Sequence, residues 1–248
     1  DQRGEEKTQS DITTVEQGMN NAFELNFENG IPDEITWKNQ AIRINNFGGE
    51  IISDGISGKA LRLPKNAYLT IDAKDLIGKS GTIILWVRPR WNYYDRIDDT
   101  LISHTLMSFE WIDPKHGYFV LSDGWWEPAG SLKTYFVFDN QQYVHTSNVH
   151  KYLQEYWVQM ACTWDDKAGI ARLFIDGQQI SEIRRPFATP NSPITIFIGC
   201  DKGTPLSNNR WADCDIDEVS FYKQSLSPKT ILKLCRQYDP DPQSRYVE

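Results

Sequence analysis

The stretch EYWVQMACTWDDKAGIARLFIDGQQI, residues 155–180, decides the expected fold of this chain. Two runs rich in apolar, β-branched and aromatic residues flank the turn-forming sequence DDKAG at 165–169, which predicts an antiparallel hairpin. The Asp-Gly pair at 176–177 predicts a second tight turn directly afterwards. Three consecutive antiparallel strands are therefore expected here.

The same strand signal recurs along the whole chain, with Gly, Pro, Asn and Asp in the gaps. Further segments of this kind lie at 23–27, 59–63, 67–72, 82–89, 118–124, 132–139, 194–201 and 215–222. The one convincing helix is SLSPKTILKLCRQY at 225–238, in which Ser227 can cap the first turn and Pro228 can occupy the first helical position. The pattern predicts an all-β fold, a two-sheet antiparallel β-sandwich or jelly roll, with a short C-terminal helix.

Length and composition limit the organisation of the chain and its partners. Of the 248 residues, we expect 1–18 to form a flexible polar N-terminal tail, 19–237 one jelly-roll domain and 238–248 a C-terminal tail. A net charge of −8, with basic residues scattered singly or in pairs, argues against a nucleic-acid partner. No stretch of eighteen apolar residues occurs, so no membrane span is expected.

The order of these segments resembles the laminin-G-like, concanavalin A-like lectin and glucanase jelly rolls, in particular the pentraxin-related form of bacterial secreted proteins. Three motifs carry the resemblance, which runs from about residue 20 to residue 236. The first, W-x-x-V-A-x-T-W-D, is matched by Trp157, Val158, Ala161, Thr163, Trp164 and Asp165. The second, L-Y-x-D-G, is matched by Leu173, Asp176 and Gly177. The third, I-D-E-V-x-x-Y-x-x-x-L-S, is matched by Ile216, Asp217, Glu218, Val219, Tyr222, Leu226 and Ser227.

The resemblance implies a secreted, periplasmic or cell-surface protein, and it implies a structural Ca²⁺ as cofactor. The matching ligand positions are Glu28, the carbonyl of Gly58, and Asp217, and calcium prefers such mixtures of carboxylate and carbonyl oxygens. The alternative is that Asp217 only caps or pairs near the edge of the sandwich.

Two aromatic clusters in turn-rich stretches suggest a ligand surface. They are WNYYDRIDDT at 91–100 and SDGWWEPAG at 122–130. Sugars stack their C–H faces on aromatic rings, while Asp, Glu and Arg bind their hydroxyl groups. The candidate ligand-binding residues are Trp91, Tyr93, Tyr94, Asp95, Arg96, Asp123, Trp126 and Glu127. The alternative is that the rings anchor the two loops to the core, an interpretation that we favour for Trp125.

Catalysis is a competing interpretation, because relatives of this fold include glucanases and alginate lyases. The glucanase motif Glu-x-Asp-x-x-Glu is absent, and the nearest sequence, Asp215-Ile-Asp217-Glu218, lies in the structural I-D-E-V segment. No Gln-x-His, G-x-S-x-G or HExxH motif occurs. If the protein is an enzyme, a His–Tyr or His–Glu pair would abstract a proton from a uronic acid. The candidate residues for this pair are His104, Glu110, Tyr135 and His145. A histidine bonded to backbone is the more common situation.

Four cysteines are too few for a disulfide framework, and they lack the spacing of a zinc site. Laminin G domains link a Cys at the start of the last strand to one near the C-terminus, which here implies Cys214–Cys235. Cys200–Cys214 is the other possible pair in an exported protein. Four buried free thiols remain an equal alternative.

These observations predict a secreted carbohydrate-binding, lectin-like module whose partner is a polysaccharide or glycan. Two other classes stay open. One is a polysaccharide lyase or glycoside hydrolase acting on the concave sheet. The other is a scaffold module that binds another envelope or extracellular protein through the aromatic loops.

Overall fold

The computed structural model describes residues 22–73, 75–90, 96–97, 100–101, 104–110, 117–123, 131–138, 142–149, 156–187, 189, 195–202 and 210–239. Within 96–101 and 117–149 the description covers the backbone only. The predicted tail 1–18 lies outside these residues, as does 240–248. The last described helix ends at Tyr238, as the helical segment 225–238 predicts.

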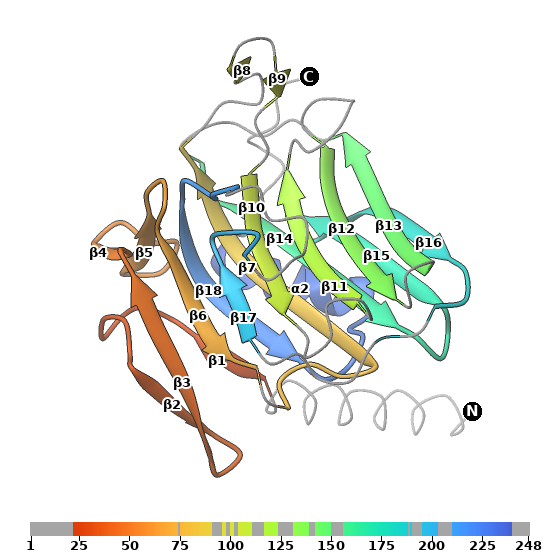
Figure 1. Cartoon of the computed structure of the whole chain (residues 1–248), viewed down its shortest axis with the longest axis horizontal. Coiled ribbons are helices and arrows are strands. Elements are labelled where there is room, and N and C mark those ends of the chain that lie inside the picture. Colours follow the sequence, from red (N-terminus) through yellow and green to blue (C-terminus); the bar gives the residue numbers. More distant parts are fainter. Residues whose placement is uncertain are drawn as a thin grey trace, which may run out of the picture.

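Two antiparallel sheets form the described molecule, which confirms the predicted β-sandwich (Figure 1). The first sheet runs in the order β16 (Gln178–Arg184), β15 (Ile170–Ile175), β14 (Val158–Asp165), β7 (Ser80–Pro89), β18 (Cys214–Tyr222), β5 (Ala60–Leu63) and β4 (Glu50–Ile52), with β1 (Phe23–Leu25) paired to β18. The second sheet runs in the order β13 (Gln142–Val149), β12 (Ser131–Phe138), β11 (Gly117–Asp123), β10 (His104–Glu110), β17 (Thr195–Ile198), β6 (Tyr68–Asp72), β3 (Gln40–Phe47) and β2 (Glu34–Trp37). A separate two-stranded ribbon joins β8 (Arg96–Ile97) to β9 (Thr100–Leu101).

The first sheet is buried on both of its faces. In β7, Ile83 and Leu85 enter the core between the two sheets, whereas Ile84 and Trp86 pack on the opposite side. Because successive side chains of a strand point to opposite faces, a strand buried on both sides needs an unbroken apolar run. This requirement explains the sequence TIILWV at 82–87.

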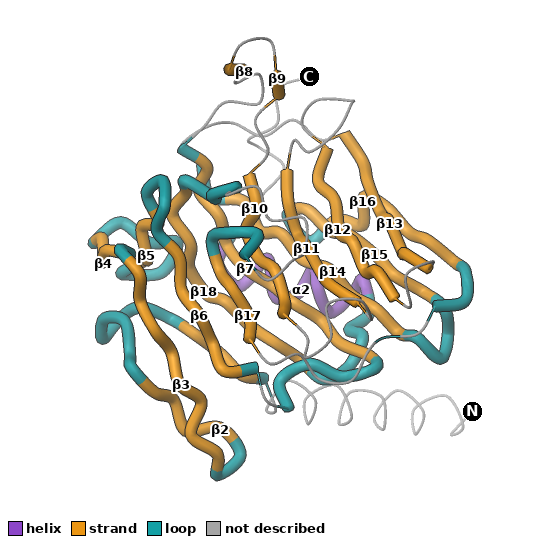
Figure 2. Tube along the Cα trace, in the orientation of Figure 1, coloured by secondary structure: helices purple, strands orange, loops and turns teal. Residues whose placement is uncertain are grey.

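Helix α2 (Pro228–Tyr238) covers the outer face of the first sheet, behind the strands in Figure 2. Ser227 is its N-cap and accepts a 3.2 Å hydrogen bond from the backbone N–H of Thr230, as the sequence predicts. Ile231 and Leu234 pack against the outward side chains of the sheet. The helix therefore closes a second, smaller apolar layer outside the main core.

In strands β3, β6 and β17 of the second sheet, buried apolar side chains on the inner face alternate with more exposed side chains on the outer face. In β6 the buried Leu69 and Ile71 alternate with Tyr68 and Thr70, which are only half-buried. No helix of the described chain covers the outer face. This face is therefore the side of the sandwich on which side chains can meet a ligand directly.

A close contact between Gly81 and Trp164 tests the packing of the main core. The Trp164 ring is buried, its Nε1 donates a 3.0 Å hydrogen bond to Gly78 O, and a Cβ on Gly81 would overlap the ring. We expect Gly81→Ala to lower the free energy of unfolding by about 1–3 kcal/mol, because a closely packed ring cannot move away. Gly78→Ala is the matched control, since its Cβ would lie 3.5 Å from the Ser80 carbonyl oxygen. Urea denaturation measures both, and equal stabilities would contradict this packing.

Candidate functional site

A row of aromatic rings lies on the outer face of the second sheet, and strand alternation places it there. In β6, Tyr68 faces outward because Leu69 and Ile71 face the core. Phe197 occupies the equivalent half-buried position in β17. Phe47 ends β3 and pairs directly with Tyr68 in the ladder. Three adjacent strands therefore present rings to the same side.

The rings are in mutual contact, with Tyr68 at the centre. Phe47 stacks on Tyr68 with centroids 4.5 Å apart and planes at 11°. Trp211 and Phe197 lie 6.0 and 6.2 Å from Tyr68, both tilted by 34°. We call Phe47, Tyr68, Phe197 and Trp211 the aromatic row. Phe47 is 45% exposed and the other three rings are half-buried, so the row offers ring surface to solvent.

Polar groups border the aromatic row. Lys202 Nζ lies 4.2 Å from the centroid of the Tyr68 ring and donates a 3.1 Å hydrogen bond to the Tyr68 hydroxyl. Asn45 Nδ2 donates a 3.0 Å hydrogen bond to Oγ1 of Thr70, two residues after Tyr68 in β6. Ring faces beside an ammonium, an amide and hydroxyls form the mixture that recognises the C–H faces and hydroxyl groups of a sugar.

The ligand-binding residues expected from the sequence lie mostly outside the described residues. Those outside are Trp91, Tyr93, Tyr94, Asp95, Trp126 and Glu127. Arg96 begins β8 and Asp123 ends β11, each with its backbone alone described. Asp123 stands opposite His104 in the ladder between β11 and β10. Segments 91–103 and 124–130 therefore join the second sheet at neighbouring positions.

That junction lies beside the aromatic row. The Nδ1 atom of His104 lies 3.2 Å from the backbone carbonyl oxygen of Trp211, which belongs to the row. His104 is the first residue of β10 after segment 91–103, and its ladder partner Asp123 immediately precedes segment 124–130. Both predicted loops thus start from strand ends next to Trp211.

The aromatic row itself was missed by the sequence interpretation, although a signal for it exists. In AYLTID the aromatic Tyr68 shares its strand parity with Thr70 and Asp72, and in ITIFIG Phe197 alternates with two isoleucines. When an aromatic residue alternates in step with the polar residues of an amphipathic strand, it is expected on the exposed face of the sheet. Which strands lie side by side cannot be read from that parity.

The residues considered for catalysis are only partly brought together. His104 is buried and Glu110 is exposed, and the two lie at opposite ends of β10, about 20 Å apart at 3.3 Å per residue. The structure therefore does not pair His104 with Glu110. Tyr135 and His145 do stand directly opposite each other in β12 and β13, where the backbone alone is described.

The first carboxylate expected at a calcium site, Glu28, contacts the turn at 55–59. Its Oε1 accepts a 3.0 Å hydrogen bond from the backbone N–H of Lys59, and its backbone oxygen accepts one of 3.0 Å from Lys59 Nζ. A Cβ on Gly58 would overlap the Glu28 carboxylate, and Gly58 has φ +64°. Only glycine accommodates both the approach and this backbone conformation without strain.

The second carboxylate, Asp217, reaches the same turn from β18. Its Oδ2 accepts a 3.3 Å bond from Ser57 N, and its Oδ1 accepts a 2.9 Å bond from Glu218 N. The side chain is fully buried, and burial is the main cause that raises its pKa to about 7, against the opposing effect of these N–H groups. A carboxylate in this setting would gain from a cation.

Glu28, Asp217 and the Gly58 carbonyl fit a calcium site in donor type, because all three supply oxygen to one turn. The Gly58 carbonyl already accepts a 2.9 Å bond from Gly55 N, and carbonyl oxygens have a second lone pair. The described residues contain no group of three His, Cys, Asp or Glu side chains that could hold a metal ion. Any ion here would therefore depend on backbone oxygens and water as well as the two carboxylates.

All four cysteines are buried free thiols, so neither predicted disulfide is present. For the pair Cys214–Cys235 the reason is geometric. Cys214 packs in the core between the sheets, whereas Cys235 of α2 packs with Trp86 on the outer face of the first sheet. A layer of strand separates the two. Burial raises the pKa of Cys200 to about 12, which keeps this thiol protonated.

Residues 63–232 match the family model described as the concanavalin A-like lectin/glucanases superfamily. The match covers more than half of the 248 residues, and the chain belongs to this superfamily. The resemblance seen in the strand motifs is thereby confirmed. No curated protein sequence matches the chain.

Solved structures show the same fold at low sequence identity. Domain 4 of AbnA, a GH43 extracellular arabinanase from Geobacillus stearothermophilus, in complex with arabinotriose, is 19% identical, has a TM-score of 0.61, and aligns over 86% of this chain and 96% of its own. The binding domain of Paraclostridial Mosquitocidal Protein 1 is 20% identical, with a TM-score of 0.64 and coverages of 88% and 52%. The binding domain of botulinum neurotoxin DC in complex with SialylT is 14% identical, with a TM-score of 0.58 and coverages of 83% and 50%. The chain thus spans nearly all of the arabinanase domain and about half of each toxin domain.

In the part of the chain that the structure describes, no helix combines the length and the apolar composition that crossing a bilayer requires.

The buried Asp217 predicts a pH dependence of stability. Its pKa is about 7 in the folded chain against an ordinary value of 3.8, so folding favours the protonated form. Its contribution to stability is complete below about pH 4 and is lost as the pH rises through 7. In chelator, the gap in unfolding free energy between the native chain and Asp217→Asn should therefore change by up to about 4 kcal/mol from pH 4 to pH 8. Urea denaturation at both pH values measures this gap, and a constant gap would refute the shifted pKa.

Proposed function

We propose that the chain is a secreted carbohydrate-binding module whose ligand lies across the aromatic row. The observation that carries the proposal is the contact of four solvent-accessible rings, centred on Tyr68, on a sheet face that no described helix covers. The exposed parts of these rings can contact the C–H groups of a sugar, and the adjacent Lys202 and Asn45 can bind its hydroxyl groups.

Two of the similar structures support a glycan as the ligand class. The arabinanase domain is a complex with arabinotriose, and the neurotoxin domain is a complex with SialylT. The arabinanase is extracellular, which supports a secreted location for this chain. The fold alone does not select a sugar, because loops and exposed side chains carry specificity on a shared sandwich.

The proposal includes the two loops expected from the sequence. Segments 91–103 and 124–130 join the sheet at His104 and Asp123, next to Trp211. We propose that Trp91, Tyr93, Tyr94, Asp95, Arg96, Asp123, Trp126 and Glu127 also contact the ligand and so lengthen the binding surface. A longer binding surface suits a polymer better than a single sugar.

Affinity gel electrophoresis tests the aromatic row, with branched arabinan and a panel of other soluble polysaccharides in the gel. We expect Tyr68→Ala to weaken binding at least about tenfold, because the central ring supports its three neighbours. Phe47→Ala should weaken it less. Tyr156→Ala is the matched control, since Tyr156 is 49% exposed and precedes β14 in the other sheet. Equal retardation of Tyr68→Ala and the native chain would refute the row as the binding site.

The same samples separate binding from catalysis. A binding module leaves polymer length unchanged and produces no absorbance of unsaturated uronates. Shortened polymer, or an absorbance that disappears in His104→Ala, would favour the lyase or hydrolase alternative. Capture of a partner protein through the same rings, without retardation by any polysaccharide, would favour the scaffold alternative.

We also propose a structural Ca²⁺ held by Glu28, Asp217 and the Gly58 carbonyl. Millimolar CaCl₂ should raise the melting temperature relative to chelator at pH 7.5, because the ion stabilises the buried Asp217 charge. Glu28→Gln and Asp217→Asn should each abolish this rise. Asp54→Asn is the matched control, because the Asp54 side chain is 79% exposed in the adjacent loop and forms an ion pair with Arg88. Equal melting temperatures of the native chain in calcium and in chelator would exclude the site.

A further inference from the structure

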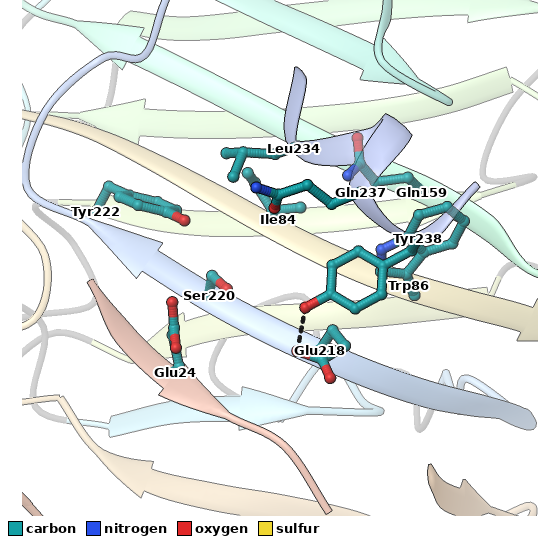
Figure 3. A pocket seen from close by; sticks show the side chains of 10 residues that line it. All are labelled: Glu24, Ile84, Trp86, Gln159, Glu218, Ser220, Tyr222, Leu234, Gln237 and Tyr238. Atoms are coloured by element: carbon teal, nitrogen blue, oxygen red, sulfur yellow. Dashed lines mark hydrogen bonds between the residues drawn. The ribbon is translucent and has the colours of Figure 1, made fainter. Parts of the chain in front are cut away.

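A pocket lies on the side of the sandwich opposite the aromatic row, between α2 and the outer face of the first sheet (Figure 3). It has a volume of about 50 Å³. Residues from β1, β7, β14 and β18 form its floor, and the last turns of α2 form its wall. It shares no residue with the aromatic row or with the proposed calcium ligands. The pocket is therefore a site separate from both.

The polar lining of this pocket is acidic and rich in hydrogen-bond acceptors. Glu24 of β1 and Glu218 of β18 supply two carboxylates, and Ser220 and Tyr222 supply hydroxyl groups. None of the residues that line the pocket is Lys, Arg or His. The Glu218 carboxylate accepts a 2.9 Å hydrogen bond from the Tyr238 hydroxyl. The pocket is thus negative without a balancing cation in its wall.

Gln159 gives an independent sign that a donor belongs in the pocket. Its side chain is 1% exposed, lines the pocket, and has an Oε1 atom with no hydrogen-bond partner among the described residues. Its backbone is fixed by two 2.8 Å bonds with Asp176. A buried acceptor left without a donor is costly, so native structures supply one. A donor bound in the pocket would satisfy this acceptor.

Two aromatic rings complete the lining. Trp86 and Tyr238 meet edge to face, with centroids 6.0 Å apart, at the end of the pocket near Gln159 (Figure 3). Aromatic ring faces attract monovalent organic cations. The β-bulge in β18, where Glu218 adopts φ +48°, is what turns this carboxylate toward the rings.

We propose that this pocket binds a primary ammonium group on an alkyl chain, either a lysine side chain of a partner or a free alkylamine. An ammonium has three donors, which match Gln159 Oε1, the Glu218 carboxylate and a hydroxyl of the lining. A volume of about 50 Å³ admits the ammonium and its first methylene group. A calcium ion fits less well, because it needs six to eight oxygens and the described residues bring no three acidic side chains together here.

Calorimetric titration with n-butylammonium chloride at pH 7 tests the proposal, with n-butanol as the neutral analogue of the same length. We expect a dissociation constant on the order of 1 mM for the amine and no binding of the alcohol. Glu218→Gln should weaken amine binding at least about tenfold. Glu34→Gln, a change at an exposed carboxylate of β2, should leave it unchanged.

Gln159→Leu separates binding from folding. Removing a buried acceptor that lacks a partner should leave the melting temperature equal or higher, while amine binding is lost. Nα-acetyl-lysine N-methylamide forms the second arm, and tighter binding of this peptide analogue than of butylammonium assigns the site to a protein lysine. The reverse order assigns it to a free amine. Equal binding of butanol, unchanged binding by Glu218→Gln, or heat only with CaCl₂ would overturn the proposal.

Discussion

Burial of the first sheet on both faces is the constraint on which the rest of this structure depends. Strands β7 and β14 pack against an inner core on one face and against further buried side chains on the other, so nearly every side chain in them is buried. The second sheet has no helix on its outer face in the described chain, and its aromatic side chains can remain accessible there. The two outer faces therefore differ: α2 covers that of the first sheet, and the accessible aromatic row lies on that of the second.

The bulge in β18 shows how a structural motif also positions chemistry. The register with β7 shifts between Asp217 and Ser220, which leaves Glu218 with a positive φ. As a result, Asp217 reaches the turn at 55–59 and the adjacent Glu218 reaches the pocket beneath α2. Asp217 is buried and Glu218 is half-buried, and burial is the main cause that raises the pKa of each. The I-D-E-V segment therefore forms part of the last strand and also positions two carboxylates.

Much of this architecture was predictable from the sequence, because turns and alternation are local properties. The hairpins at 155–180, the capped helix after Ser227 and the all-β class follow from residues close together in the chain. The aromatic row was not predictable, since Tyr68 and Trp211 meet only through strand order. For the same reason the sequence could not show that Cys214 and Cys235 lie on opposite faces of one sheet.

The position of α2 has a consequence for how the domain can be arranged in a larger assembly. The helix and its pocket lie on one side of the sandwich, and the aromatic row lies on the other, with the intersheet core between them. A molecule held by the rings does not obstruct the helical side. One outer face of the sandwich can therefore be bound while the opposite face remains accessible to a second partner.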